Sequence, residues 1–304
     1  MLFKKETPSD PLRKYVDCYW VAKADGDKVL RVVSPSTNIS LCIHLGHSAN
    51  YRLLPSEFYK GQDVSLDAII KWVNTNPTTA QNVIIGPHRR LMVETCDNFF
   101  YALGIEFKTG VRKSFFGTEI LRLSDKIMPL DSGNVLLSRL PAIVSNCALE
   151  DIFDVVDRYL TDKLLPYIDS KGVSGNMLGL IEEISEHPFD ANAPLMVGKM
   201  KTCLRSIEYC FKQYTGLTPK QFISIHRINR VVECMIEHQE KNLAEVLELC
   251  GYYDQAHINR DFKIVGALPA TQVFKNIRRL QVGSPGALYL NSDLDSVCGF
   301  NLLT

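Results

Sequence analysis

The sequence predicts an α+β protein with a β-rich N-terminal domain, a helical connector and an all-α C-terminal domain. Three observations predict this class: short β-branched and aromatic runs recur near the start, an apolar period of about 3.6 residues follows, and Gly and Pro then separate short helical patterns. The chain has 304 residues, 46% of them hydrophobic, which suits two domains. We place these at 1–110 and 171–280, with a connector at 111–170 and an unassigned tail at 281–304.

The N-terminal domain is predicted from strands that follow one another with no helix between them. This order favours a sandwich or a cupin-like barrel. Asp25-Gly26-Asp27 stands between the first two runs and predicts a hairpin turn, whereas the stretch 53–82 has no clear pattern. The expected strands are Tyr15–Val21, Val29–Val33, Ile39–Leu45, Val83–Ile85, Leu91–Thr95 and Tyr101–Phe107.

The connector is predicted to contain one clear helix, over Cys147–Leu165, where apolar residues recur with the helical period. A weaker helical pattern covers Val135–Ile143. Such a segment either joins the two domains, forms a dimer face or packs on its own β domain, and the sequence leaves these roles open.

The C-terminal domain is predicted from short helices with tight connections, and we expect no strand in it. Gly216 and Gly251, with Pro219 and Pro269, separate the helices. The expected helices are Met177–Ile184, Met196–Met200, Ile207–Tyr214, Phe222–Ile236, Leu243–Leu249 and Ala256–Ile264.

An approximate internal repeat is the most informative feature of this domain. Each copy reads I-x3-F-K, then Gly, two residues and Pro, and the copies begin at Ile207 and Ile258. Residues four apart share one helix face, so the Ile and Phe are expected to be buried. A short helix and a Gly-containing turn precede the second copy. This is the pattern of a helix-turn-helix unit, whose second helix enters the major groove of DNA.

Charge is distributed unevenly around the repeat, although 34 basic and 34 acidic residues give the whole chain a net charge of zero. The zero total excludes a uniformly basic coat for nucleic acid. The stretch 199–230 holds seven basic residues and one acidic, and 255–279 holds five and one, whereas 231–254 holds one basic residue and six acidic. Each repeat copy therefore lies in a basic block suited to phosphate contacts.

The motifs around the repeat extend to a longer pattern. The first copy begins Leu204-Arg-Ser-Ile-Glu-Tyr-Cys-Phe-Lys212, and the second reads Gly251-Tyr-Tyr-Asp-Gln-Ala-His-Ile-Asn-Arg-Asp-Phe-Lys263. Over about residues 185–275 the chain resembles the AraC/XylS family of bacterial transcription regulators. The resemblance implies two helix-turn-helix units joined by a long helix and bound to promoter DNA, with a β-rich effector-binding or dimerisation domain before them.

Positions in the family motif indicate which side chains would contact DNA. Arg can clasp guanine, Glu accepts from cytosine, Gln and Asn suit adenine, and Ala suits the thymine methyl group. The candidates for base contacts are Arg205, Glu208, Tyr209, Gln255, Ala256, Asn259 and Arg260. The candidates for phosphate contacts are Lys212 and Lys263.

The first unit departs from the family pattern more than the second. Lys201 stands where Gly is usual at the turn, and Cys203 stands where a Ser-type N-cap is common, so the helix after it is expected to be weakly capped. Val197 and Leu247 replace Ala, and Ile258 replaces Phe. We therefore expect the first unit to bind weakly or to contact mainly the DNA backbone.

Other constellations are weaker. Trp20, Trp72 and Phe107 are candidates for an effector pocket, with an ordinary core as the alternative. His44 and His47, with His88 available, resemble part of a cupin-type metal site, but a third ligand of proper spacing is missing. No catalytic motif is present, so we expect no enzyme activity, no metal and no cofactor.

We therefore expect a sequence-specific transcriptional regulator, an activator that binds double-stranded promoter DNA as a homodimer. RNA polymerase and a small-molecule effector are its further expected partners, and an alternative regulator without a ligand acts through partner proteins. Nine scattered cysteines and the lack of an export signal or an apolar membrane segment indicate the bacterial cytoplasm. The rival from another class is a cupin-like metal-dependent enzyme or small-molecule-binding protein with a non-functional helical appendage.

Overall fold

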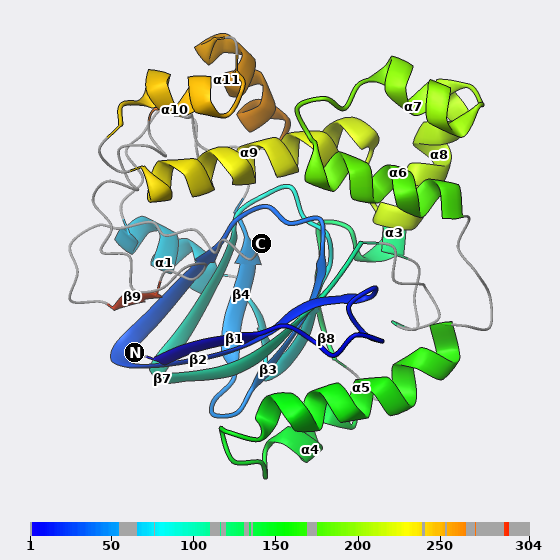
Figure 1. Ribbon diagram of the computed structural model, residues 1–304. Helices are drawn as coiled ribbons and strands as arrows, with labels where there is room; N and C mark the ends of the chain where they lie inside the picture. Colours follow the sequence, from blue (N-terminus) through cyan, green and yellow to red (C-terminus); the bar gives the residue numbers. More distant parts are fainter. Residues whose placement is uncertain are drawn as a thin grey trace.

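The computed structural model describes residues 2–54, 66–75, 77–109, 116, 120–130, 134, 136–168, 175–238, 241–252, 254–265, 271 and 289–291. Over these residues a curved sheet lies between a helical layer above it and two helices below it (Figure 1). The predicted α+β class, with a β-rich N-terminal half and a helical C-terminal half, is confirmed. Among the described helices, none is long and apolar enough to cross a membrane.

The strands of the described chain form one antiparallel sheet of main order β1-β2-β7-β3-β6-β8, in which β4 also pairs with β5 and β7, and β9 with β2. They are β1 (Leu2–Glu6), β2 (Val16–Val33), β3 (Ile39–His44), β4 (Ala49–Leu53), β5 (Thr78–Ala80), β6 (Asn82–Ile85), β7 (Met92–Phe107), β8 (Ile127–Pro129) and β9 (Tyr289–Asn291). Because β8 pairs with β6, the sheet extends into the segment that we predicted as connector. β9 gives the tail a short strand that the sequence did not indicate.

β2 and β7 are single long strands where two strands each were expected. The hairpin turn predicted at 25–27 is wrong, because β2 continues through these residues with a register shift between Asp25 and Lys28. Both halves of β2 pair with β7, so the chain needs no reversal and a bulge accommodates the irregularity. The runs predicted at 91–95 and 101–107 likewise merge into β7.

The sheet is buried on both faces. On β3, Leu41 and Ile43 belong to one apolar core, and Cys42 belongs to another on the opposite face, as the two-residue period of a strand requires. The first core is closed by α3 (Ile120–Leu123), α4 (Leu140–Val144) and α5 (Ile152–Ile168). Of the roles left open for the main connector helix, the structure shows packing on its own β domain.

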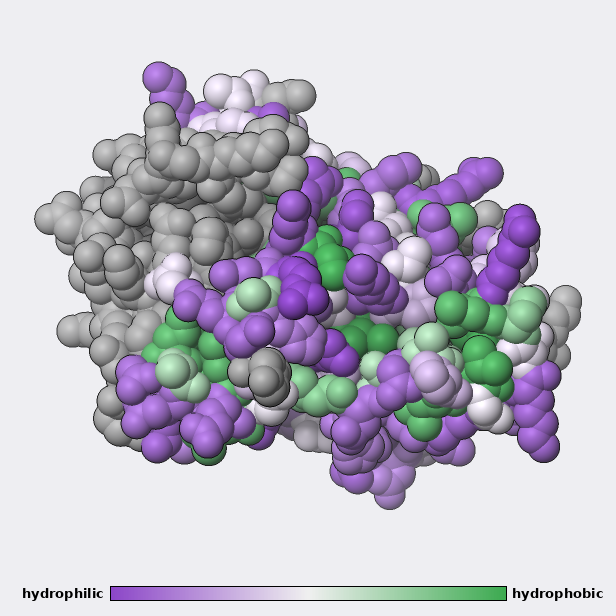
Figure 2. Space-filling model, turned by 90° about the horizontal axis from the view of Figure 1, so that it is seen from above, coloured by the Kyte–Doolittle hydropathy of each residue, from purple (hydrophilic) through white to green (hydrophobic). Residues whose placement is uncertain are grey.

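The C-terminal half contains α6 (Gly175–Glu186), α7 (Ala193–Met200), α8 (Leu204–Thr215), α9 (Pro219–Glu237), α10 (Leu243–Leu249) and α11 (Gln255–Ile264). All six expected helices are present. Their core also takes in Leu54, Val73, Leu91 and Val93 from the N-terminal half, where Val73 lies on α1 (Leu66–Thr75). Seen from above Figure 1, the described surface carries mainly hydrophilic side chains with apolar patches between them (Figure 2).

The long helix α9 contacts the β-rich half directly. Thr37 Oγ1, in the loop between β2 and β3, lies 3.1 Å from His226 Nε2. One helical turn further along, Asn229 Nδ2 donates to the carbonyl oxygen of Pro35 at 3.1 Å. The helix that joins the two predicted DNA-reading units is therefore also the helix that docks on the N-terminal domain.

Candidate nucleic-acid interface

The second helix-turn-helix unit is formed by α10 and α11. Asn242 and Glu245 form a reciprocal capping box at the start of α10, and Gly251 supplies the left-handed backbone of the turn, with φ of 76°. At the start of α11 the Asp254 side chain accepts a hydrogen bond from the backbone N–H of His257 at 2.7 Å. Both helix starts and the turn thus have the residues that their local geometry favours.

Asp261 holds α11 against α9 from inside the domain. Its Oδ1 accepts a hydrogen bond from Ser224 Oγ at 2.7 Å, and its Oδ2 accepts one from the Tyr252 hydroxyl at 2.8 Å. Arg227 on α9 lies 3.8 Å from the same carboxylate and also donates to the carbonyl oxygen of Pro188. Burial and the neighbouring carboxylate raise the pKa of Tyr252 above its usual value, which keeps its hydroxyl protonated as a donor.

The first unit, α7 and α8, is held by fewer local interactions. Asn192 caps α7, but Lys201 after it takes a left-handed conformation, with φ of 48°, where glycine is favoured. Cys203 is the N-cap of α8 and makes no side-chain cap hydrogen bond, which confirms the weak cap expected from the sequence. Val197 is 39% exposed, whereas Leu247 in α10 is only 5% exposed, so Leu247 is absorbed by the core and Val197 lies outside it.

The predicted ridges and contact residues lie on opposite sides of the two recognition helices. Ile207 and Phe211 on α8, and Ile258 and Phe262 on α11, are buried as expected. All the predicted base and phosphate contacts are exposed: Arg205, Glu208, Tyr209, Lys212, Gln255, Ala256, Asn259, Arg260 and Lys263. Tyr209 is the most open large apolar side chain of α8, at 67% exposure. The geometry leaves both outer faces accessible to a partner.

Internal ion pairs reduce the charge of the first basic block. Lys199 pairs with Glu183, Arg230 pairs with Glu233, and Arg227 is engaged with Asp261 and backbone carbonyls. Among the described residues, the exposed cations of this block that lie outside these ion pairs are Lys201, Arg205, Lys212 and Lys220. The count of basic residues in the sequence therefore overstated the charge that this block offers to phosphates.

The structure does not bring together the three candidate effector-pocket residues. Trp20 lies in the apolar core on the inner face of the sheet, which is the face that carries Cys42. Phe107 lies in the core on the outer face, which α3, α4 and α5 cover, and Trp72 packs against the core shared with the helical domain. Trp20 packs so closely on β7 that a Cβ at Gly104 would lie 1.8 Å from its ring. These side chains are parts of packed cores.

The three histidines considered for a cupin-type metal site are also apart. His44 is buried on the inner face of the sheet, whereas His47 is exposed beyond the end of β3. His88 is buried with both ring nitrogens near backbone carbonyl oxygens, those of Gly86 and Ser34. The ligand set on which the rival enzyme depended is therefore not assembled.

Sequence reasoning missed Asp261 and its partners. Asp261 follows Arg260 in a helix with an exposed polar face, and no local pattern distinguishes a buried acid there. Ser224 and Tyr252 reach it from 37 and 9 residues away. The position on the buried Ile–Phe face was the one available signal.

Comparison with known proteins gives two family matches. A family described as a helix-turn-helix domain matches residues 198–276, and a family described as a domain of unknown function matches residues 4–129. No curated protein matches the chain.

Solved structures similar to this chain include ToxT from Vibrio cholerae O395 and the same protein bound to (E)-4-(8-methylnaphthalen-1-yl)but-3-enoic acid. Each is 10% identical and covers 90% of this chain; the first aligns over 97% of its own length with a TM-score of 0.42, the second over 99% with 0.43. Unsaturated fatty acid-bound wild-type ToxT from Vibrio cholerae strain SCE256 is 11% identical over 90% of this chain and 95% of its own, with a TM-score of 0.40.

The helix-turn-helix match runs from the end of α7 through α11, and the Ile–Phe ridges repeated in the two recognition helices are buried as expected. Residues 198–276 therefore form a helix-turn-helix domain of the kind that the resemblance to the AraC/XylS family of DNA-binding transcriptional regulators implied.

Proposed function

We propose that the chain is a sequence-specific regulator that reads double-stranded promoter DNA with α8 and α11. The observation that carries the proposal is the exposed polar face that each recognition helix presents opposite its buried Ile–Phe ridge. Because α9 has 19 residues and is about 28 Å long, it separates the two units by roughly one turn of DNA. One chain then reaches two successive major grooves.

In this proposal α11 is the principal reader of bases. Gln255 and Asn259 suit adenine, Ala256 suits a thymine methyl group, and Arg260 suits guanine. Lys263, in the last turn of α11, contacts phosphate. The capped start of α11 and its attachment to α9 through Asp261 hold these side chains in one orientation.

On α8, Arg205, Glu208 and Tyr209 are the proposed base contacts and Lys212 a phosphate contact. The uncapped helix start and the left-handed Lys201 make this unit less rigid. We infer that α8 contributes less to sequence discrimination than α11.

Replacement of Arg260 tests the proposal. After selecting a preferred site from random DNA, Arg260→Ala is expected to weaken binding to it by about 1–3 kcal/mol, or roughly 5- to 150-fold. Fluorescence anisotropy against the selected site and a scrambled one measures this. Lys163→Ala, an exposed cation on α5, is the matched control and should leave both affinities unchanged. Equal weakening on both DNAs would reduce Arg260 to a phosphate contact, and no weakening would contradict the interface.

We also propose that the N-terminal domain controls DNA binding through α9. The support is the contact of Thr37 and Pro35 with this helix and the apolar core that Leu91 and Val93 share with the helical domain. An effector or partner that alters this docking would shift which arrangement of the two units is populated. Full-length Asn229→Ala, which removes one docking bond, is expected to change affinity for the selected site without touching α8 or α11; unchanged affinity would argue against control through this contact.

Homodimerisation, activation and contact with RNA polymerase complete the proposed mechanism. Sedimentation analysis of the full chain with and without its selected DNA tests the dimer. Transcription from a promoter carrying that site, with purified polymerase, tests activation. A monomer at all concentrations, or transcription that the protein does not raise, would remove the corresponding step.

A further inference from the structure

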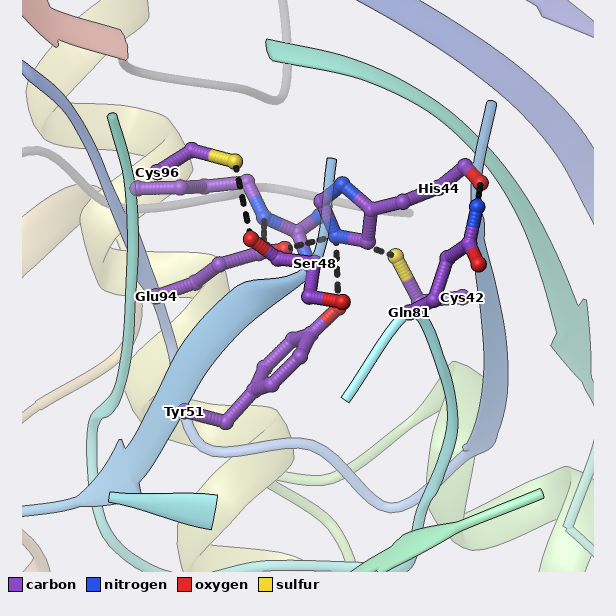
Figure 3. Close-up of polar contacts among 8 residues, drawn as sticks. Cys42, His44, Ser48, Tyr51, Gln81, Glu94 and Cys96 are labelled. Atoms are coloured by element: carbon purple, nitrogen blue, oxygen red, sulfur yellow. Dashed lines mark hydrogen bonds and ion pairs between the residues drawn. The ribbon is translucent and has the colours of Figure 1, made fainter. Parts of the chain in front are cut away.

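A compact set of polar side chains lies on the inner face of the N-terminal sheet, far from the recognition helices. Cys42 and His44 are two residues apart on β3 and so share one face, Tyr51 comes from β4 and Glu94 from β7 (Figure 3). All four are buried. The β-rich half thus encloses sulfur, nitrogen and oxygen donors beside the apolar side chains of this core.

These donors converge on one atom, His44 Nε2. Glu94 Oε1 and the Tyr51 hydroxyl each lie 2.6 Å from it, and Cys42 Sγ lies 3.9 Å from it. The nitrogen has a single lone pair or a single proton, so it cannot serve three partners at once. His44 Nδ1, by contrast, is buried with no hydrogen-bond partner among the described residues. The polar contacts of Nε2 are therefore with the other three groups of this set.

The separations suit a four-coordinate cation. The donor atoms of Cys42, His44 and Glu94 all lie within 4.8 Å of one another. With bonds of about 2.0–2.3 Å, donor atoms around a tetrahedral zinc ion lie roughly 3.3–3.8 Å apart, so the pairs here need to adjust by about 1 Å or less. When Nε2 carries a proton, Cys42, Tyr51 and Glu94 compete for that one proton. A cation at their centre would instead bind all of these donor atoms together with Nε2.

Arg31 supplies the support that a metal ligand needs. It lies opposite Glu94 in the β2–β7 register, and its Nε donates to Glu94 Oε2. Tyr51 lies opposite Glu94 on the other side, in the β4–β7 register. The Arg31 contact occupies one carboxylate oxygen and aims the other, Oε1, at His44. Hydrogen bonds of this kind from outside the ligand set orient metal-binding carboxylates.

We propose that Cys42, His44 and Glu94 bind one Zn²⁺ ion, with the Tyr51 hydroxyl at the fourth position. Mixed thiolate, imidazole and carboxylate ligands are those that zinc accepts in four-coordinate sites. Of the histidines weighed from the sequence, only His44 takes part. The ion joins β3, β4 and β7. Val93, the residue before Glu94 on β7, points to the opposite face and packs in the core shared with the helical domain. The bound ion therefore stiffens the strand that supports the junction between the two domains.

Metal analysis of the full chain tests the proposal. Protein purified without a metal-affinity tag, stripped with chelator, loaded with Zn²⁺ and desalted should retain one equivalent by elemental analysis. Loading with Co²⁺ should instead give the thiolate-to-cobalt charge-transfer absorption and the visible bands of a tetrahedral ion. Cys42→Ser should abolish the charge-transfer absorption. Cys18→Ser is the matched control, because Cys18 is a buried thiol of the same inner core outside the ligand set, and it should keep the absorption.

X-ray absorption spectroscopy of the zinc-loaded wild-type chain identifies the atoms bound to zinc. Because it uses no variant, the result does not depend on whether Cys42→Ser folds. One sulfur and three nitrogen or oxygen neighbours are expected. Failure of the wild-type chain to retain zinc would show instead a metal-free network of Arg31, Glu94 and His44 and would overturn the proposal. An unchanged cobalt spectrum in folded Cys42→Ser would overturn it as well.

Discussion

The two helix-turn-helix units share their buried ridges but differ in how the recognition helix is held. In the second unit a glycine forms the turn, Asp254 caps α11, and Asp261 ties that helix to α9. In the first, Lys201 occupies the left-handed turn and Cys203 leaves α8 without a side-chain cap. The apolar repeat therefore specifies two helices, whereas polar residues outside the repeat determine how firmly each helix is positioned.

The recognition helix of the first unit is supported by contact with α3. Gly216, which ends α8 with φ of 75°, lies beside α3, where a Cβ would be 3.2 Å from the carbonyl oxygen of Ile120. Its recognition helix therefore rests on the N-terminal half. The contrast is therefore one of support: polar contacts within the helical domain hold α11, whereas α8 rests on the N-terminal half.

Replacement of Asp261 should separate the two units most clearly. Asp261→Ala removes the acceptor of Ser224 and Tyr252 and leaves Arg227 without its carboxylate. Loss of one partner from a buried charged network costs about 3–5 kcal/mol. The midpoint of urea unfolding, followed by the helical circular dichroism signal, measures it. The matched control is Cys210→Ala, at the corresponding position of α8, for which we expect a much smaller loss. Equal losses would show that the network does not distinguish the units.

Acid provides the next largest effect, at the junction on α9. Burial lowers the pKa of His226 from 6.5 to about 4, so the folded state disfavours the charged imidazole while the unfolded chain accepts the proton. The stabilising contribution is complete above pH 6.5 and is lost as pH falls from there toward 4. By linkage, His226 alone should cost about 2 kcal/mol of unfolding free energy between about pH 8 and pH 5.

Urea unfolding of wild type and His226→Gln at both pH values isolates this contribution. Glutamine keeps a polar group near Thr37 and Ser185, which lie 3.1 and 3.4 Å from His226 Nε2, but does not titrate. The variant should therefore show a smaller pH dependence than the wild type. An identical slope in both chains would place the acid sensitivity elsewhere.

The same residues show what the sequence could and could not reveal. Ile207 and Phe211 were predicted to be buried from their spacing alone, because a four-residue interval places two side chains on one helix face whatever the fold. The turn at 25–27 was wrong because its residues favour a reversal locally, whereas pairing of both flanks with β7 decides the outcome. The partners of Asp261, and the convergence of Tyr51 and Glu94 on His44, arise from contacts between distant segments, which no local pattern encodes.

A smaller effect should come from the N-caps of the two recognition helices. One substitution adds a cap to α8, and another removes the cap of α11. Cys203→Asp gives α8 the cap that α11 already has and is expected to stabilise the helical domain by about 1 kcal/mol, whereas Asp254→Ala should destabilise it by about the same amount. Thermal unfolding of each variant and of the wild type measures both changes in stability. If the Asp at position 203 brings no gain, the position of α8 is set by its contacts with α3 rather than by its own first turn.

The smallest expected effect is at the turn of the first unit. Lys201→Gly relieves a left-handed backbone that costs a lysine about 1 kcal/mol or more, but glycine also gives the unfolded chain more freedom, so a net gain of only about 0.5 kcal/mol is expected. Gly251→Ala, the reverse change in the second unit, should lose about 1 kcal/mol, because its φ is 76° and nothing else lies close enough to hinder a Cβ. The two substitutions therefore test backbone conformation without steric complication. Opposite signs would establish that the units differ in the strain of their turns, and a loss at both positions would mean that the Lys201 side chain itself stabilises the first unit.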